Sequence, residues 1–96
     1  MLKIVNSSLA ETDLLDIWLY TAEEWSLVQA DTYVAQIGKS IDRLLEHPEL
    51  GKDRSDLRKG YRSLLINHHI VFYRLIGEEI EVVKVLHETV DIDRHL

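Results

Sequence analysis

Histidine is the residue type in this sequence best suited to acid–base or metal chemistry, and the five histidines do not form a recognisable site. His68 and His69 are adjacent, and adjacent residues of a strand point to opposite faces, so this pair is a poor metal chelate. The others are His47, His87 and His95. The chain contains no cysteine, no glycine-rich phosphate loop, no HExxH and no GxSxG motif. The residues themselves therefore predict no catalytic residue, no metal site and no cofactor.

Charged side chains offer a second kind of site. The formal net charge is −6. This charge argues against a domain that binds nucleic acid through its phosphates, because such domains carry a net positive charge. We therefore expect no direct sequence-specific binding of nucleic acid by this chain. One concentrated positive region is either a solvated loop or a site for an anion or an acidic partner; it consists of Lys52, Arg54, Arg58, Lys59 and Arg62. A set of acidic residues is interpreted most simply as the solvated face of a helix; it consists of Glu11, Asp13, Asp16, Glu23 and Glu24.

Large aromatic side chains have two interpretations. Trp18, Trp25 and Tyr33 are most simply core or groove-lining residues, and the alternative is that part of this aromatic surface is exposed for a partner. Tyr73 is open in the same way. It is either a core residue whose hydroxyl is hydrogen-bonded or part of a binding site.

The stretch from Gly60 to His87 predicts a three-stranded antiparallel meander. Its apolar runs are rich in β-branched and aromatic residues, and turn residues separate them at Asn67-His68 and at Gly77-Glu78-Glu79. The predicted strands are Tyr61–Ile66, His69–Ile76 and Ile80–Leu86. Leu2–Val5 alternates loosely and predicts a short further strand. A meander this apolar needs a cover on one face.

The first of two predicted helices runs from about Leu9 to Glu24. Ser8 and Glu11 have the form of a capping box at its start. Apolar residues then recur at helical spacing through Trp18.

The second helix has the clearest periodicity in the sequence. Ser26 begins a second capping-box pattern, and apolar residues continue at helical spacing to about Glu46, where His47-Pro48 ends the helix. Gly38 lies inside this helix, where glycine costs about 1 kcal/mol relative to alanine. We therefore expect another backbone to approach Gly38 closely.

These elements predict a single α+β domain over residues 1–96. The expected order is β-αα-βββ, an antiparallel sheet with a two-helix hairpin packed on one face. Pro48 to Lys59 is predicted as a loop, and the segment after His87 as a turn or tail that packs partly back. The N-terminus lacks the apolar region of a signal peptide, and no apolar run approaches the ~20 residues of a membrane span. We expect a cytoplasmic protein.

Residues spread over nearly the whole chain, in order and with fitting gaps, form a family pattern. They are Trp25, Gln29, Ala30 and Tyr33; Pro48 and Gly51; Leu57, Arg58, Gly60, Tyr61 and Arg62; His69, Phe72, Tyr73 and Arg74; and Val85, Leu86, His87 and Asp91. This pattern resembles the ParE toxins of the RelE/ParE superfamily. Each motif is weak alone, and together they are fairly specific. The predicted α+β order also resembles the RelE/ParE-like fold.

The resemblance implies the toxin of a type II toxin–antitoxin system, of the kind associated with growth arrest and plasmid stabilisation. Its antitoxin would resemble ParD, with a ribbon-helix-helix head that binds DNA and a tail that folds over the toxin. ParE-like toxins are held to inhibit DNA gyrase by stabilising its cleaved-DNA state, which blocks replication, and not to cut nucleic acid themselves. The expected partners are therefore a ParD-like antitoxin and DNA gyrase, with no membrane. The expected partner-binding residues are Trp18, Trp25, Tyr33, Arg58, Arg62, His69, Tyr73 and His87.

This sequence departs from the family pattern in two places. Ser26 stands where the family usually has glycine after the tryptophan, and serine ends the first helix poorly but caps the second well. The second departure concerns the RelE-like branch, whose strand-borne cations and C-terminal Tyr or His would stabilise charge on a scissile phosphate and move protons. Ser63–Ile66 supplies no such cation, and Glu88 stands where an aromatic residue is often found.

Two alternatives to gyrase inhibition stay open. The first is a RelE-like ribosome-dependent mRNA endonuclease, in which several side chains would cluster at one end of the sheet; they are Arg62, His69, Tyr73, Arg74 and His87. The second is a non-toxic module that keeps the fold and only binds an antitoxin.

Overall fold

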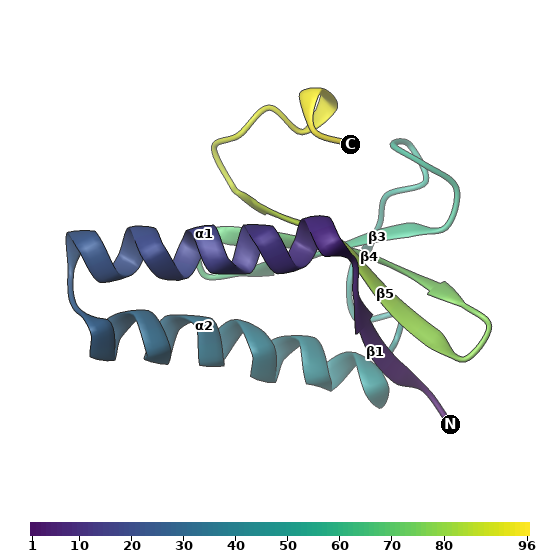
Figure 1. Ribbon diagram of the computed structural model, residues 1–96. Helices are drawn as coiled ribbons and strands as arrows, with labels where there is room; N and C mark the ends of the chain where they lie inside the picture. The colour runs from purple at the N-terminus through teal and green to yellow at the C-terminus, as the bar shows by residue number, and fades with distance from the viewer.

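Strands β3, β4 and β5 form the centre of a five-stranded sheet in the computed structural model, which describes residues 1–96 (Figure 1). β3 spans Tyr61–Ile66, β4 spans His69–Ile76 and β5 spans Glu79–His87. They pair antiparallel in chain order, so the predicted meander is confirmed. Asn67 and Gly77 have positive φ angles of 55° and 57° in the two turns, a conformation that glycine and asparagine adopt at little cost.

The edge strand β1, Lys3–Asn6, lies next to β5 and runs parallel to it. The sheet is therefore mixed, and the prediction of a purely antiparallel sheet is wrong for this strand. No hairpin joins β1 to its neighbour, because the two helices intervene. The direction of β1 therefore depends on packing that no local pattern encodes.

The other edge strand, β2, consists of Lys52–Asp53 within the predicted loop. It pairs with Ser63 and Arg62 of β3, and the strand order across the sheet is β1-β5-β4-β3-β2. Two residues are too few to show the alternation by which a strand is recognised, so the sequence carries no signal for β2.

Two antiparallel helices follow β1 and agree with the predicted helices. α1 spans Ser8–Glu24, α2 spans Leu27–Asp42, and a 3-10 turn, η1, continues α2 through Arg43–Leu45. The Ser26 hydroxyl accepts the Gln29 N–H at 3.0 Å, so the predicted cap of α2 is confirmed. None of the helices is both long enough and apolar enough to cross a membrane.

The N-cap of α1 is Ser7, so the capping box predicted for Ser8 and Glu11 is wrong by one residue. The Ser7 hydroxyl accepts the Ala10 N–H at 3.0 Å and donates to the Val83 carbonyl at 2.7 Å. This second bond joins the start of α1 to β5. The contact with Val83 therefore determines which of two adjacent serines caps α1. The local sequence carries no signal for this contact.

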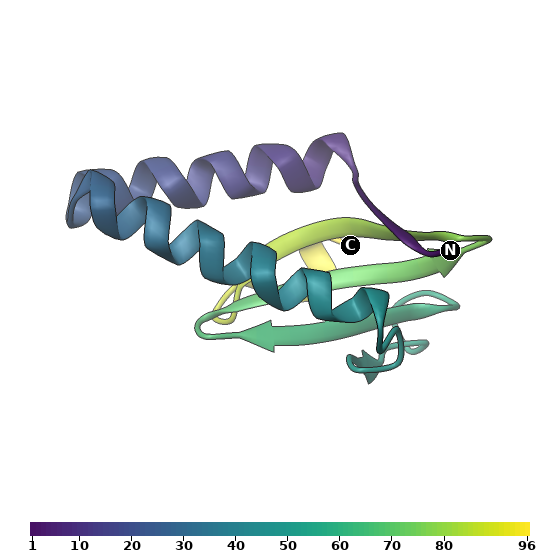
Figure 2. The same cartoon turned by 90° about the horizontal axis from the view of Figure 1, so that it is seen from below.

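Both helices lie on one side of the sheet, as predicted (Figure 2). α2 crosses the face of the sheet, and α1 lies beside β5. The core between helices and sheet contains Ile37 and Ile41 of α2, Val71 and Tyr73 of β4, and Val82 of β5. Each of these side chains is at most 4% exposed, so the meander has the apolar cover that its composition requires.

The C-terminal segment lies on the opposite face of the sheet from α2 (Figures 1 and 2). It contains a short 3-10 turn, η2, at Ile92–Arg94. Val90 and Leu96 are half-buried, in agreement with the predicted tail that packs partly back. Phe72 alternates with the core residues of β4, so it points to this second face, where it is fully buried.

The predicted close approach at Gly38 is wrong, because a Cβ added there would meet no atom within 4 Å. The close approach occurs at Gly51 instead. A Cβ at Gly51 would lie 2.7 Å from the Tyr73 ring and 2.9 Å from the Ser63 carbonyl oxygen. Glycine is therefore required where the loop passes over the end of the core, and not where the helices pack.

Candidate functional site

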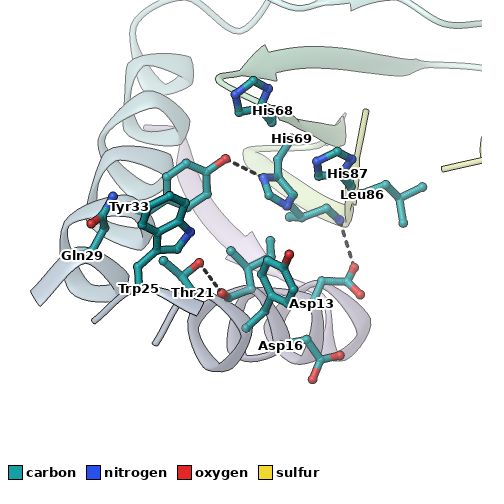
Figure 3. Close-up of a pocket in the computed structure, with 13 residues that line it drawn as sticks. Asp13, Asp16, Thr21, Trp25, Gln29, Tyr33, His68, His69, Leu86 and His87 are labelled. Atoms are coloured by element: carbon teal, nitrogen blue, oxygen red, sulfur yellow. Dashed lines mark hydrogen bonds between the residues drawn. The ribbon is translucent and has the colours of Figure 1, made fainter. Parts of the chain in front are cut away.

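A groove of about 660 Å³ lies between the helical hairpin and the ends of β4 and β5 (Figure 3). One wall is α1, a second is the α1–α2 connection with the start of α2, and the third is formed by the β3–β4 turn and β5. The lining residues that bear on its chemistry are Asp13, Asp16, Trp25, Tyr33, His69 and His87. Apolar residues such as Ile17 and Leu86 also line the groove, which is mainly apolar with a few polar groups.

Tyr33 of α2 and His69 of β4 meet inside the groove (Figure 3). The Tyr33 hydroxyl lies 2.6 Å from His69 Nδ1, and the two rings meet edge to face with their centroids 5.5 Å apart. Burial raises the pKa of the Tyr33 hydroxyl. Burial, followed by the nearby His87 and His68, lowers the pKa of His69. Both groups are therefore held neutral, and they share one short hydrogen bond at the floor of the groove.

His87, at the end of β5, is exposed beside this pair. Its Nδ1 accepts the Thr89 N–H at 3.2 Å and lies 2.8 Å from the Thr89 hydroxyl. Because Nδ1 accepts a backbone N–H, the ring proton of a neutral His87 is on Nε2. Its ring meets that of His69 edge to face, with centroids 5.2 Å apart.

His68 lies in the turn before β4 rather than on the strand. Its Nδ1 is 2.6 Å from a carboxylate oxygen of Glu88, in an exposed pair. His68 is therefore engaged outside the Tyr33–His69 pair, although its ring also lines the groove.

The carboxylate of Asp13 joins α1 to β5 at the edge of the groove. Asp13 Oδ1 is 2.8 Å from Lys84 Nζ, and Asp13 Oδ2 accepts the Val85 N–H at 3.0 Å. The β1 strand pairs only with the first residues of β5, up to Val82, so this N–H has no strand partner on that side. The interpretation of Asp13 as a solvated residue is therefore wrong, because its side chain is only 13% exposed and both of its oxygens are bonded.

Four of the residues predicted to bind a partner line the groove together: Trp25, Tyr33, His69 and His87. Trp25 has 69% of its surface exposed, and His87 is exposed as well. The family pattern therefore collects residues from the α1–α2 connection, α2, β4 and β5 at one place. Trp18, Arg58, Arg62 and Tyr73 do not line the groove.

Trp18 is half-buried between the helices, where its Nε1–H donates to Asp31 Oδ1 at 2.8 Å. Arg58 is exposed in the loop before β3. Arg62 donates to the Gly51 carbonyl at 2.8 Å, and so ties the segment before β2 to β3. These three side chains make structural contacts or lie on other surfaces of the molecule.

Tyr73 is a core residue with a satisfied hydroxyl, as one of its two interpretations predicted. It is 1% exposed. Its hydroxyl donates to the Pro48 carbonyl at 2.7 Å, and the hydroxyl oxygen accepts the Gly51 N–H at 2.8 Å. Burial raises the pKa of Tyr73. The hydroxyl holds the loop before β2 against the end of the core, and no surface partner can reach it.

The residues required for the ribonuclease alternative are not gathered at one end of the sheet. His69 and His87 line the groove, whereas Arg62 and Tyr73 border a separate hollow beside Pro48. His69 and Tyr73 are four residues apart on one strand, a separation of roughly 13 Å. Arg74 forms an ion pair with Glu81, in which the Arg74 Nε lies 2.8 Å from the Glu81 carboxylate. The predicted clustering of these residues is therefore wrong.

Three further residues line the groove without having been predicted as site residues: Asp16, Tyr20 and Gln29. Asp16 and Tyr20 are four residues apart on α1, a spacing that places them on one side of a helix together with Ile17. That spacing is a usable signal. It could not be interpreted because α1 has apolar residues on more than one side, and nothing local shows which side borders a groove.

The chain matches the family described as "ParE toxin of type II toxin-antitoxin system, parDE" over residues 4–92. It is 38% identical over 87 residues to Toxin ParE1 of Caulobacter vibrioides, covering 91% of this chain and 90% of that relative. It is 40% identical over 91 residues to Toxin ParE1 of Mycobacterium tuberculosis, covering 94% and 93%. Toxin ParE of Escherichia coli is 38% identical over 84 residues, covering 86% and 82%.

Solved structures support the same fold. One described as "Chromosomal ParDE TA system from P. aeruginosa" superposes with a TM-score of 0.80 at 20% identity, covering 91% of this chain and 96% of that one. One described as "YoeB-YefM complex from Staphylococcus aureus" gives a TM-score of 0.61 at 22% identity, covering 91% and 97%. The resemblance found in the sequence is confirmed by the family match and by the fold. The chain belongs to the ParE toxin family of type II toxin–antitoxin systems, within the RelE/ParE superfamily.

Proposed function

We propose that this ParE toxin inhibits DNA gyrase as a protein ligand without catalytic residues, and that a ParD-like antitoxin neutralises it by occupying the groove. The observation that carries the proposal is the convergence of the family residues Trp25, Tyr33, His69 and His87 on one open groove. These residues come from four separate segments of the chain: the α1–α2 connection, α2, β4 and β5. Their convergence is what a binding surface requires.

The shape and lining of the groove favour a peptide segment as its occupant. A helical hairpin and a sheet form its walls, and amphipathic helices bind in such grooves through apolar anchors. Trp25 supplies an exposed aromatic ring, a residue type that is enriched among the side chains that dominate binding energy. The antitoxin tail would pair its own polar groups with His69 inside the groove and with the exposed His87 beside it.

The groove is a poor site for cleaving a phosphodiester. Asp13 and Asp16 line it, and Glu88 is paired with His68 at its border. Carboxylates oppose the charge that develops on a scissile phosphate, whereas catalysis requires cations or N–H donors aimed at that charge. The proposal of a non-enzymatic toxin follows from this arrangement and from the separation of Arg62 and Tyr73 from the histidines.

The test is DNA supercoiling and DNA cleavage by gyrase, with purified toxin and with or without the candidate antitoxin. We expect loss of supercoiling, accumulation of cleaved DNA and reversal by the antitoxin. Unchanged gyrase activity would contradict the proposed target. Cleavage of mRNA in a translating extract would then identify the ribonuclease alternative. Unimpaired growth on induction without antitoxin would identify the non-toxic binding module.

A further inference from the structure

Asp16 is the one charged side chain lining the groove that has neither an ion pair nor a hydrogen bond. It lies on α1, next to Asp13 along the wall, and its side chain is exposed (Figure 3). Asp13 differs because Lys84 and the Val85 N–H already bind both of its oxygens. A cation that approaches the groove from outside can therefore pair with Asp16, whereas the Asp13 side chain is only 13% exposed and is already paired with Lys84.

Water solvates the Asp16 carboxylate while the groove is open. An apolar segment that covers the groove removes part of that water, and an ionised carboxylate loses free energy when it is covered without a compensating partner. Trp25, Ile17 and Leu86 nevertheless favour an apolar occupant in the same groove. An occupant satisfies both requirements if it has an apolar face for the groove interior and a cation at the edge of that face.

The net charge of the whole chain also favours a cationic occupant. With a formal net charge of −6, the toxin attracts cationic segments and repels acidic ones over distances comparable to the Debye length. Arginine suits the site better than lysine, because its planar guanidinium pairs with a carboxylate through two parallel hydrogen bonds and is more weakly hydrated.

We propose that the groove selects a basic amphipathic helical segment of the antitoxin, and that Asp16 determines specificity by pairing with an Arg or Lys at the edge of the apolar face of that segment. The inference rests on the proposed function, because it names the chemistry of the antitoxin segment that occupies the groove. It adds a requirement for a positive charge at one position of the partner.

The experiment measures association rate and Kd between the full-length toxin and its antitoxin at low and high ionic strength. The variants are Asp16→Asn, which removes the charge, and Asp16→Lys, which reverses it. Asp42→Lys is the matched control, because Asp42 is an exposed aspartate at the end of α2 that does not line the groove. Circular dichroism and thermal unfolding establish that each variant folds.

We expect Asp16→Lys to weaken binding roughly tenfold at low salt, mainly through a slower association rate, since charges at the border of an interface act chiefly on encounter. The loss should shrink at high salt and be absent in Asp42→Lys. Replacing the pairing Arg or Lys of the antitoxin with Glu should weaken binding to the wild-type toxin and restore binding to Asp16→Lys.

Equal Kd values for wild type, Asp16→Lys and Asp42→Lys would overturn the inference and leave the groove as the antitoxin site. A loss in Asp16→Lys that no charge-reversed antitoxin restores would also overturn it. Failure of the wild-type toxin to bind the antitoxin at all is a different result, because it would overturn the proposed function itself.

Discussion

The hydroxyl of Ser7 donates a 2.7 Å hydrogen bond to the carbonyl of Val83. Val83 is the residue of β5 that is passed over where the pairing with β4 shifts, between Val82 opposite Tyr73 and Lys84 opposite Phe72. Ser7 supplies a side-chain hydrogen bond to the carbonyl of this bulge residue. The same hydroxyl caps α1, so one side chain fixes the start of the helix to an irregularity in the sheet.

Ser7→Ala should therefore destabilise the protein more than the loss of an ordinary helix cap. The cap alone contributes about 1 kcal/mol, and the unsatisfied Val83 carbonyl adds about 1 kcal/mol or more. Chemical denaturation measures the change in the free energy of unfolding. Ser8→Ala is the matched control, because Ser8 is exposed and its side chain makes no hydrogen bond. Equal effects of the two substitutions would mean that Ser7 has no special role.

The Tyr73 hydroxyl leads to a second prediction about stability. Tyr73→Phe removes the acceptor of the Gly51 N–H and the donor to the Pro48 carbonyl. A buried polar group left without a partner costs about 1–3 kcal/mol, so we expect a loss of that size in the free energy of unfolding. Affinity for the antitoxin should not change, because Tyr73 is buried away from the groove.

Tyr20→Phe is the control for this substitution. Tyr20 lines the groove and is 64% exposed, and its hydroxyl makes no hydrogen bond within the chain. Its loss should leave stability unchanged. If Tyr73→Phe weakened antitoxin binding while leaving stability unaltered, the assignment of Tyr73 to the core would be wrong.

His69 gives a prediction about pH. Burial and the neighbouring His87 and His68 lower its pKa below the ordinary value of 6.5 in the folded chain, and Glu88 acts weakly in the opposite direction. Below pH 6.5 the unfolded chain therefore binds a proton that the folded chain resists. Stability should fall as the pH drops through 6.5 and continue to fall until the lowered pKa of His69 is reached.

His69→Gln removes this titration and should flatten the dependence of the unfolding free energy on pH between about 7 and 5. His47→Gln, an exposed histidine outside the groove, should keep the wild-type slope. Denaturation curves at several pH values provide the measurement. Parallel pH profiles for wild type and His69→Gln would show that another group is responsible.

Much of the fold could be predicted from the sequence because its patterns are local. The β-branched runs predict the strands β3 to β5, and the helical spacing of apolar residues predicts α2. The parallel direction of β1, the two-residue strand β2 and the cap at Ser7 depend on contacts between distant segments, and no local pattern encodes them.

The groove could be predicted only in part. Trp25, Tyr33, His69 and His87 were identified by their place in the family pattern, and the fold brings them together. Asp13 was misinterpreted because its partner is the free backbone of β5 beyond the end of β1. The local sequence around an acidic helix residue is the same whether its side chain is solvated or hydrogen-bonded to the edge of a sheet.

The two tryptophans, which sequence alone left equivalent, should respond differently to substitution. Trp25 is 69% exposed and lines the groove. Trp25→Ala should therefore weaken antitoxin binding by about 2 kcal/mol, or roughly thirtyfold in Kd, with little change in stability. Trp18→Ala should lower stability instead, because Trp18 is half-buried and its Nε1–H binds Asp31 across the helical hairpin.

Leu27→Ala separates the groove from general surface hydrophobicity. Leu27 is 64% exposed near Trp25 in the sequence, and it does not line the groove. If the groove is the docking site, Leu27→Ala should bind the antitoxin with wild-type affinity, measured by isothermal titration calorimetry. Equal losses in Leu27→Ala and Trp25→Ala would mean that the antitoxin covers the tip of the helical hairpin rather than the groove, because only that surface includes both side chains.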